Sequence, residues 1–139
     1  MPNIMTKAAS TAYNTIFRAV QRYDLTEWEH APVTMKPVYG VYHVFCDKGW
    51  RELVADQIGS LKRSGLYEVT WRLYVSCIVK DRAEADELRR MIGCDKTELI
   101  AVETDPECFE YPALEFMQAK SREEECLFYY FHTKGVSYY

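Results

Sequence analysis

Residues 38–45, VYGVYHVF, and residues 71–79, WRLYVSCIV, are rich in β-branched and aromatic side chains and show no simple alternation of polar and apolar residues. Runs of this kind are typical of strands that are covered on both faces, as in a parallel sheet. Residues 97–103 (TELIAVE) and 125–132 (ECLFYYFH) predict two further strands, the first of them near an edge of the sheet.

The segments between these strands have the spacing of helices. Apolar residues recur at helical intervals through residues 50–67, and Gly65 is a suitable stop. Asp81 can cap a second helix that ends before Gly93, and Pro112 can occupy the first position of a third. Because each helix is long enough to cross back over the sheet, the strands that it joins are predicted to be parallel.

The alternation of strands and helices predicts a single three-layer, Rossmann-like α/β domain with a mostly parallel sheet over residues 38–139. Residues 1–37 are predicted to form a helical extension and a linker that contains Pro32 and Pro37. The commonest arrangement places the fourth strand beside the first, in the order 3-2-1-4. Ligands of such sheets bind outside the carboxyl ends of the strands where the order reverses, here between strands one and four.

Two strand ends that are distant in sequence are therefore predicted to share one crevice. Histidine exchanges protons near neutral pH, lysine carries a positive charge for phosphate, and glycine lets backbone amides approach a ligand. These residue types suit a phosphorylated or nucleotide-linked substrate. The candidate ligand-binding residues are His43, Asp47, Thr133, Lys134 and Gly135, and the candidate catalytic residues are Glu110 and His132.

Each candidate also has a purely structural interpretation. His43 can be a buried, hydrogen-bonded strand residue, Lys134 an exposed turn lysine, and Asp47 a cap for the helix that follows. Glu110 stands at the start of a predicted helix, where a carboxylate interacts favourably with the helix dipole. The same carboxylate could reach a sugar hydroxyl or act as a base.

Composition excludes several classes of protein. The net charge is −4 and no basic stripe is present, which argues against a nucleic-acid partner. No apolar run approaches the roughly 18 residues of a membrane span. The five cysteines are dispersed without CxxC pairs or zinc-ligand spacing, which predicts reduced thiols and a cytoplasmic location. No metal-ligating residue is assigned, and a divalent metal that accompanies a nucleotide-linked substrate is left open as an alternative.

Three segments, in order along the chain, resemble glycosyltransferase-like proteins of microbes and large viruses. They are YGVYHVFCDKGWRELVADQIGSLKRSGLY (39–67), ECFEYPALEFMQ (107–118) and LFYYFHTKGVS (127–137). The distinctive elements are SGLY, EYP and HTKG, and the resemblance extends over residues 38–138.

The resemblance implies the N-terminal half of a GT-A-like fold, which binds a nucleotide-sugar donor. GT-A enzymes carry a metal-binding DxD motif where this chain reads His132-Thr133-Lys134, so Lys134 could replace the charge of a divalent cation on a diphosphate. Equally, the departure could mean that catalysis is lost. By matching motif, the resemblance implies roles for His43, Glu110, Tyr111, Pro112, His132, Thr133, Lys134 and Gly135.

Three hypotheses of function follow. The first is a sugar transferase in which Glu110 is the base and His132 and Lys134 neutralise the diphosphate. The second is a non-catalytic nucleotide-binding, sugar-binding or protein-interaction module, with residues 1–37 contacting a second copy or another protein. The third is an unrelated small α/β enzyme acting on phosphate esters.

Overall fold

Four parallel strands organise residues 36–133, the part of the chain that the computed structural model describes. They are β1 (Val38–Phe45), β2 (Arg72–Ile78), β3 (Thr97–Glu103) and β4 (Leu127–His132), in the sheet order β3-β2-β1-β4. Both the parallel pairing and the predicted order 3-2-1-4 are confirmed. Lys134 and Gly135 lie outside the described residues, as does the predicted extension up to residue 35.

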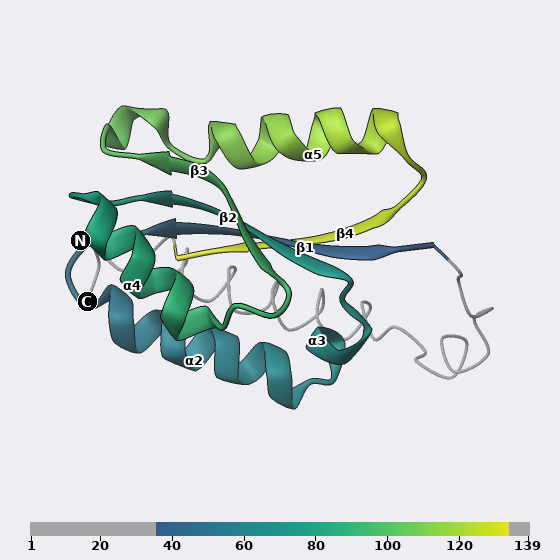
Figure 1. Cartoon of the computed structure of the whole chain (residues 1–139), viewed down its shortest axis with the longest axis horizontal. Coiled ribbons are helices and arrows are strands. Elements are labelled where there is room, and N and C mark those ends of the chain that lie inside the picture. Colours follow the sequence, from purple (N-terminus) through teal and green to yellow (C-terminus); the bar gives the residue numbers. More distant parts are fainter. Residues whose placement is uncertain (1–35, 134–139) are drawn as a thin grey trace, which may run out of the picture. The chain divides into compact units, whose positions relative to one another are not determined.

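Helices cover both faces of this sheet. The helices α2 (Trp50–Arg63) and α4 (Arg82–Ile92) lie against one face, and α5 (Tyr111–Glu123) lies against the other (Figure 1). A short helix, α3 (Leu66–Val69), follows α2, and a 3₁₀ turn, η2 (Pro106–Cys108), precedes α5. The single helix predicted for residues 50–67 is therefore two helices. The helix is interrupted at Gly65, the predicted stop. The φ of 79° at this residue is a conformation that favours glycine.

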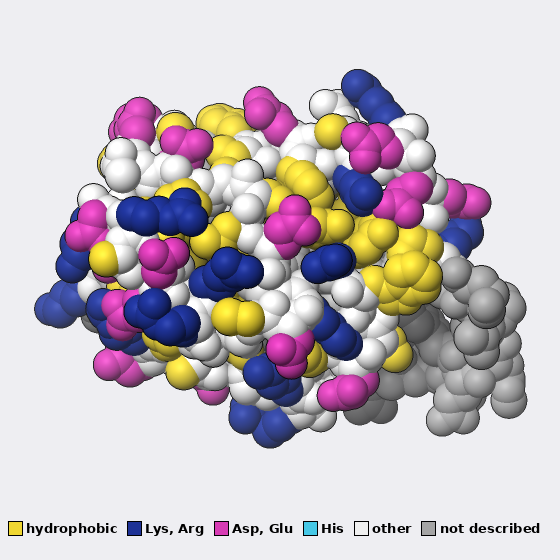
Figure 2. Space-filling model, viewed as in Figure 1, with side chains coloured by type: hydrophobic (Ala, Val, Ile, Leu, Met, Phe, Trp, Pro, Cys, Tyr) yellow, Lys and Arg dark blue, Asp and Glu magenta, His cyan; other side chains and the backbone are white. Residues whose placement is uncertain are grey.

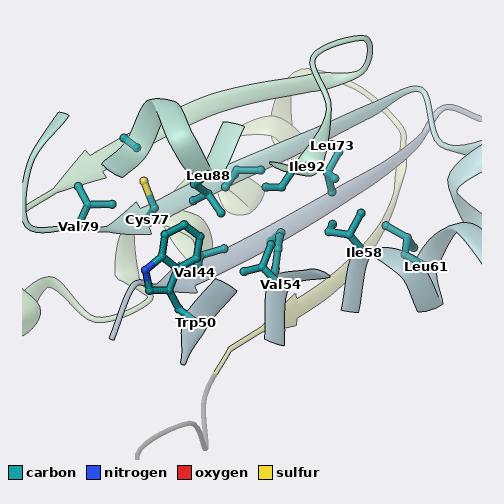
Figure 3. Close-up of a cluster of buried hydrophobic side chains, with 13 residues drawn as sticks. Val44, Trp50, Val54, Ile58, Leu61, Leu73, Cys77, Val79, Leu88 and Ile92 are labelled. Carbon is teal, nitrogen blue, oxygen red and sulfur yellow. The ribbon is translucent and has the colours of Figure 1, made fainter. Parts of the chain in front are cut away.

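Two apolar cores follow from the alternation of side chains along β1. The larger lies between the sheet and the helices α2 and α4, where Val44, Val54 and Leu88 are fully buried (Figure 3). The smaller lies under α5 and contains Tyr39, Val41, Tyr74 and Ala113. Side chains of β1 that face α5 lead from this smaller core toward His43 and Phe45 at the carboxyl end of the strand.

The predicted cap of α4 is confirmed. Asp81 accepts a hydrogen bond from the backbone N–H of Glu84 at 2.9 Å, and Gly93 follows the helix. No helix within residues 36–133 is both long enough and apolar enough to cross a membrane.

Replacing Thr97 with valine is expected to raise the free energy of unfolding by about 1 kcal/mol. Thr97 is only 4% exposed, and its Oγ1 has no hydrogen-bond partner among the described residues. Valine keeps the shape and removes the desolvated hydroxyl. The matched control is Thr70→Val, because the buried Thr70 hydroxyl donates to the carbonyl of Leu66 at 2.7 Å. Denaturant unfolding in which both variants lose stability equally would contradict this account.

Candidate functional site

A cavity of about 470 Å³ opens at the carboxyl edge of the sheet, on the face that α5 covers. Parallel strands present their carboxyl ends at one edge, and the arrowheads of β1, β2 and β3 share that edge in Figure 1. The volume suits a small-molecule ligand. Residues of β1 and β2, together with Thr133 directly after β4, form one wall, and residues of the segment 106–111 form the other. The lining residues are His43, Phe45, Ile78, Pro106, Glu107, Phe109, Glu110, Tyr111 and Thr133.

Thr133 joins the ends of β1 and β4. Its backbone N–H donates to the carbonyl of His43 at 3.1 Å, and its Oγ1 accepts from the N–H of Phe45 at 2.8 Å. The residue is 2% exposed, so these bonds form away from bulk water. Thr133 therefore extends the pairing of the two strands past His132, and it holds the sheet wall of the cavity together.

His43 is bound to the neighbouring strand through one ring nitrogen. Its Nδ1 lies 2.8 Å from Oγ of Ser76 on β2, so among the ring nitrogens Nε2 is the one without a hydrogen-bond partner in the described residues. Burial lowers the pKa of His43, the nearby Glu110 carboxylate opposes that shift, and His132 adds to it. The imidazole is therefore neutral at physiological pH.

Glu110 is held by a tyrosine of β4 instead of capping its own helix. The Tyr130 hydroxyl donates to Oε2 of Glu110 at 3.2 Å, and the Glu110 side chain makes no capping bond to α5. Burial, together with the Glu110 charge, raises the pKa of Tyr130, so the phenol keeps its proton and remains a donor. Oε1 of Glu110 is left to accept a hydrogen bond from a ligand.

Two aromatic side chains flank Glu110 and were only partly anticipated. Phe109 and Tyr111 are 54% and 60% exposed, and their rings meet edge to face with centroids 6.1 Å apart. Large apolar side chains exposed together in a cavity mark a ligand-contact surface. The motif resemblance included Tyr111, but sequence reasoning missed Phe109. Its φ of 46° is unusual for a residue with a side chain, and no sequence signal predicts it.

The remaining candidates lie elsewhere at the same edge or outside the described residues. Asp47 is exposed, accepts from the backbone N–H of Lys48 at 2.7 Å and is not among the lining residues. It is not the side-chain cap of α2 either. His132 is the register partner of His43, and its ring lies 5.7 Å from that of Tyr130. Its catalytic role stays a prediction.

Charge is mixed on the visible surface and acidic in the cavity. Lysine and arginine side chains alternate with aspartate and glutamate on the face in Figure 2. Of the described lining residues, Glu107 and Glu110 are the acidic ones and His43 the basic one. No group of three or more potential metal ligands occurs within residues 36–133.

Stability is expected to fall as the pH drops below 6.5, the ordinary pKa of histidine. Because burial keeps the folded-state pKa of His43 below that value, the unfolded chain binds a proton that the folded chain does not. The free energy of unfolding then declines by up to about 1.4 kcal/mol per pH unit until the pH reaches the folded-state pKa. His43→Gln should show a shallower slope in urea unfolding over this range. Equal slopes would show that His43 does not carry the effect.

Comparisons of the chain with protein-family models, with curated proteins and with solved structures gave no match. The resemblance to glycosyltransferase-like proteins therefore stays a prediction.

Proposed function

We propose that the cavity binds the sugar-phosphate portion of a nucleotide sugar, as the donor-binding site of a glycosyltransferase-like protein. Its position supports this, because ligands of open parallel sheets bind beyond the carboxyl ends of the strands where the order reverses. In this sheet that point lies between β1 and β4, where His43 and Thr133 line the cavity.

The sheet wall carries hydrogen-bond donors for phosphate oxygens. Oγ1 of Thr133 already accepts from Phe45, so its own hydrogen can be donated to a ligand. His43 contributes the second polar group on this wall through Nε2. His43 is in β1 and Thr133 directly follows β4, and the backbone hydrogen bond from Thr133 to His43 holds the two together. A pair of donors fixed in this way suits an oxygen-rich group such as a phosphate.

The loop wall carries the features that a sugar ring needs. Glu107 and Glu110 offer carboxylate oxygens for sugar hydroxyls, and Phe109 and Tyr111 offer exposed rings for the apolar face of the sugar. The single observation that carries the proposal is that the sheet wall and the loop wall line the same cavity. A ligand with an oxyanion at one end and a hydroxylated ring at the other matches them.

The negative charge of a diphosphate needs a positive charge beside it, and the described lining residues include no lysine or arginine. Lys134 follows Thr133 directly in the sequence and is the proposed counter-charge. A divalent cation brought by the nucleotide is the alternative, and it makes manganese dependence part of the test. With Lys134 as the counter-charge, binding does not require manganese.

Tyr111→Ala is expected to weaken binding of a nucleotide sugar about threefold to tenfold, the contribution of one aromatic contact. The full chain is titrated with UDP-glucose and with GDP-mannose, with and without manganese, and thermal stability is followed. Ligand at a hundredfold excess over its Kd should stabilise the wild type by about 2.7 kcal/mol.

The matched control is Trp71→Ala, since Trp71 is 62% exposed but precedes β2 at the opposite edge of the sheet. Equal weakening by both substitutions, or no stabilisation by any nucleotide sugar, would refute the proposed site. Release of free sugar from the bound donor would favour a transferase, and stable binding without release would favour a binding module.

A further inference from the structure

Ser76 has a polar side chain inside a strand that is otherwise buried and mostly apolar. It lies on β2, is 1% exposed and is the register partner of His43 on β1. Its Oγ lies 2.8 Å from Nδ1 of His43, which is the hydrogen bond that it makes among residues 36–133. The cavity, in contrast, is lined by His43 and not by Ser76. Ser76 therefore acts on a ligand only through the imidazole.

The direction of this hydrogen bond follows from burial. A buried hydroxyl hydrogen without an acceptor is costly, whereas a hydroxyl oxygen tolerates an unused lone pair more readily. Among the described residues, the acceptor within reach of Ser76 is the lone pair of Nδ1. A neutral imidazole whose Nδ1 accepts must carry its hydrogen on Nε2.

We infer that Ser76 is a positioning residue that donates to Nδ1 of His43 and fixes the Nε2–H tautomer, so that His43 presents a hydrogen-bond donor to the ligand's phosphate oxygen. The tautomer is a property of the protein alone, and its use in binding rests on the proposed function. Sequence patterns could not reveal this pair, because the two residues are neighbours only through the register of β1 and β2.

The charged and titratable groups around His43 come from both sides of the cavity. Strand β4 contributes His132, the segment before α5 contributes Glu107 and Glu110, and β2 contributes the neutral Ser76. Protonation of His43 would place hydrogens on both ring nitrogens and would oblige Ser76 to accept instead of donate. The tautomer is therefore measured above the pKa of His43, where the imidazole is neutral.

The test is the ¹⁵N NMR spectrum of the histidine side chains in the full chain, with His43→Gln used to assign the His43 signals. The expected wild-type result is a protonated-type shift at Nε2 and an unprotonated-type shift at Nδ1. Ser76→Ala should move both shifts toward a mixture of tautomers, and Ser76→Thr, which keeps the hydroxyl, should restore the wild-type pattern. A wild-type Nδ1–H tautomer, or shifts unchanged by Ser76→Ala, would overturn the inference. A wild-type Nδ1–H tautomer is enough on its own to overturn the inference, so that outcome does not require either Ser76 variant to fold.

Binding of UDP-glucose separates this inference from the proposed function. If both hold, Ser76→Ala binds about threefold to tenfold more weakly than Ser76→Thr, the effect of one misdirected hydrogen bond. If the wild type shows the Nε2–H tautomer, Ser76→Ala shifts it toward a mixture, and no nucleotide sugar binds, the proposed function fails and the structural role of Ser76 stands. If the wild type binds the ligand but shows the Nδ1–H tautomer, the proposed function stands and the role of Ser76 fails.

Discussion

Replacing Gly40 with alanine is expected to lower the free energy of unfolding by about 3 kcal/mol, the upper range for overpacking a core. A Cβ at this position would lie 2.5 Å from Cζ and Oη of Tyr129 and 2.7 Å from Cδ1 of Leu73. Gly40 is in β1, between β2 and β4, so the strand cannot move away from either neighbour. The Tyr129 ring is also restrained, because its hydroxyl lies in a 2.8 Å hydrogen bond with Oγ1 of Thr70.

Gly59→Ala is the matched control for Gly40→Ala. Gly59 lies inside α2, and the nearest atom to its added Cβ is Nη1 of Arg63, at the end of a flexible side chain. Alanine is the better helix former, so this variant should be more stable than the wild type by about 0.5–1 kcal/mol. Urea unfolding that gives Gly40→Ala the stability of the wild type would show that the packing around β1 is looser than described.

Truncating Glu84 to alanine is expected to cost about 3 kcal/mol of unfolding free energy, since it leaves the buried indole N–H of Trp50 and the partly buried backbone N–H of Lys80 without an acceptor. Glu84 is 6% exposed. Its Oε1 accepts from Nε1 of Trp50 at 3.2 Å, and its Oε2 accepts from the backbone N–H of Lys80 at 2.9 Å. The carboxylate thus connects α2, the segment that follows β2 and the first turn of α4.

Glu87→Ala tests whether this loss depends on burial. Glu87 is on the same helix, and its carboxylate forms a two-pronged, exposed pair with Arg51, at 2.6 Å and 2.7 Å. Water and salt screen such a pair, so its removal should change stability far less than the removal of Glu84. Guanidinium unfolding in which both variants lose the same stability would refute a special role for the buried carboxylate.

The sequence predicts the sheet because its signals are local and agree with one another. Residues 38–45 and 97–103 form strands with the bounds that their composition predicts, and Asp81 caps its helix as expected. Parallel order then follows from the crossovers, which brings His43 beside His132 without any contact being known. The fold and the sheet wall of the cavity can therefore be predicted from the sequence.

The loop wall is predicted only in part. The sequence indicates Glu110 and Tyr111, but the shape of this wall depends on conformations that several distant residues set together. The backbone of Phe109 has an uncommon φ, and the Glu110 carboxylate is directed to Tyr130 on β4 and not to its own helix. Asp47 is a candidate from the sequence that the structure does not place in the cavity. Its side chain bonds the next backbone N–H, so a strand-end carboxylate is used locally and does not line the cavity.

The most direct test of the central claim is to map the bound ligand onto the backbone. A ¹⁵N-labelled full chain is titrated with UDP-glucose and with GDP-mannose, and amide shifts are followed by two-dimensional NMR. The account predicts the largest changes at Phe45, Glu110 and Thr133, which line the cavity, with the amide of Trp71 unchanged at the opposite edge. Saturable changes centred on Trp71, or no change with either nucleotide sugar, would contradict it.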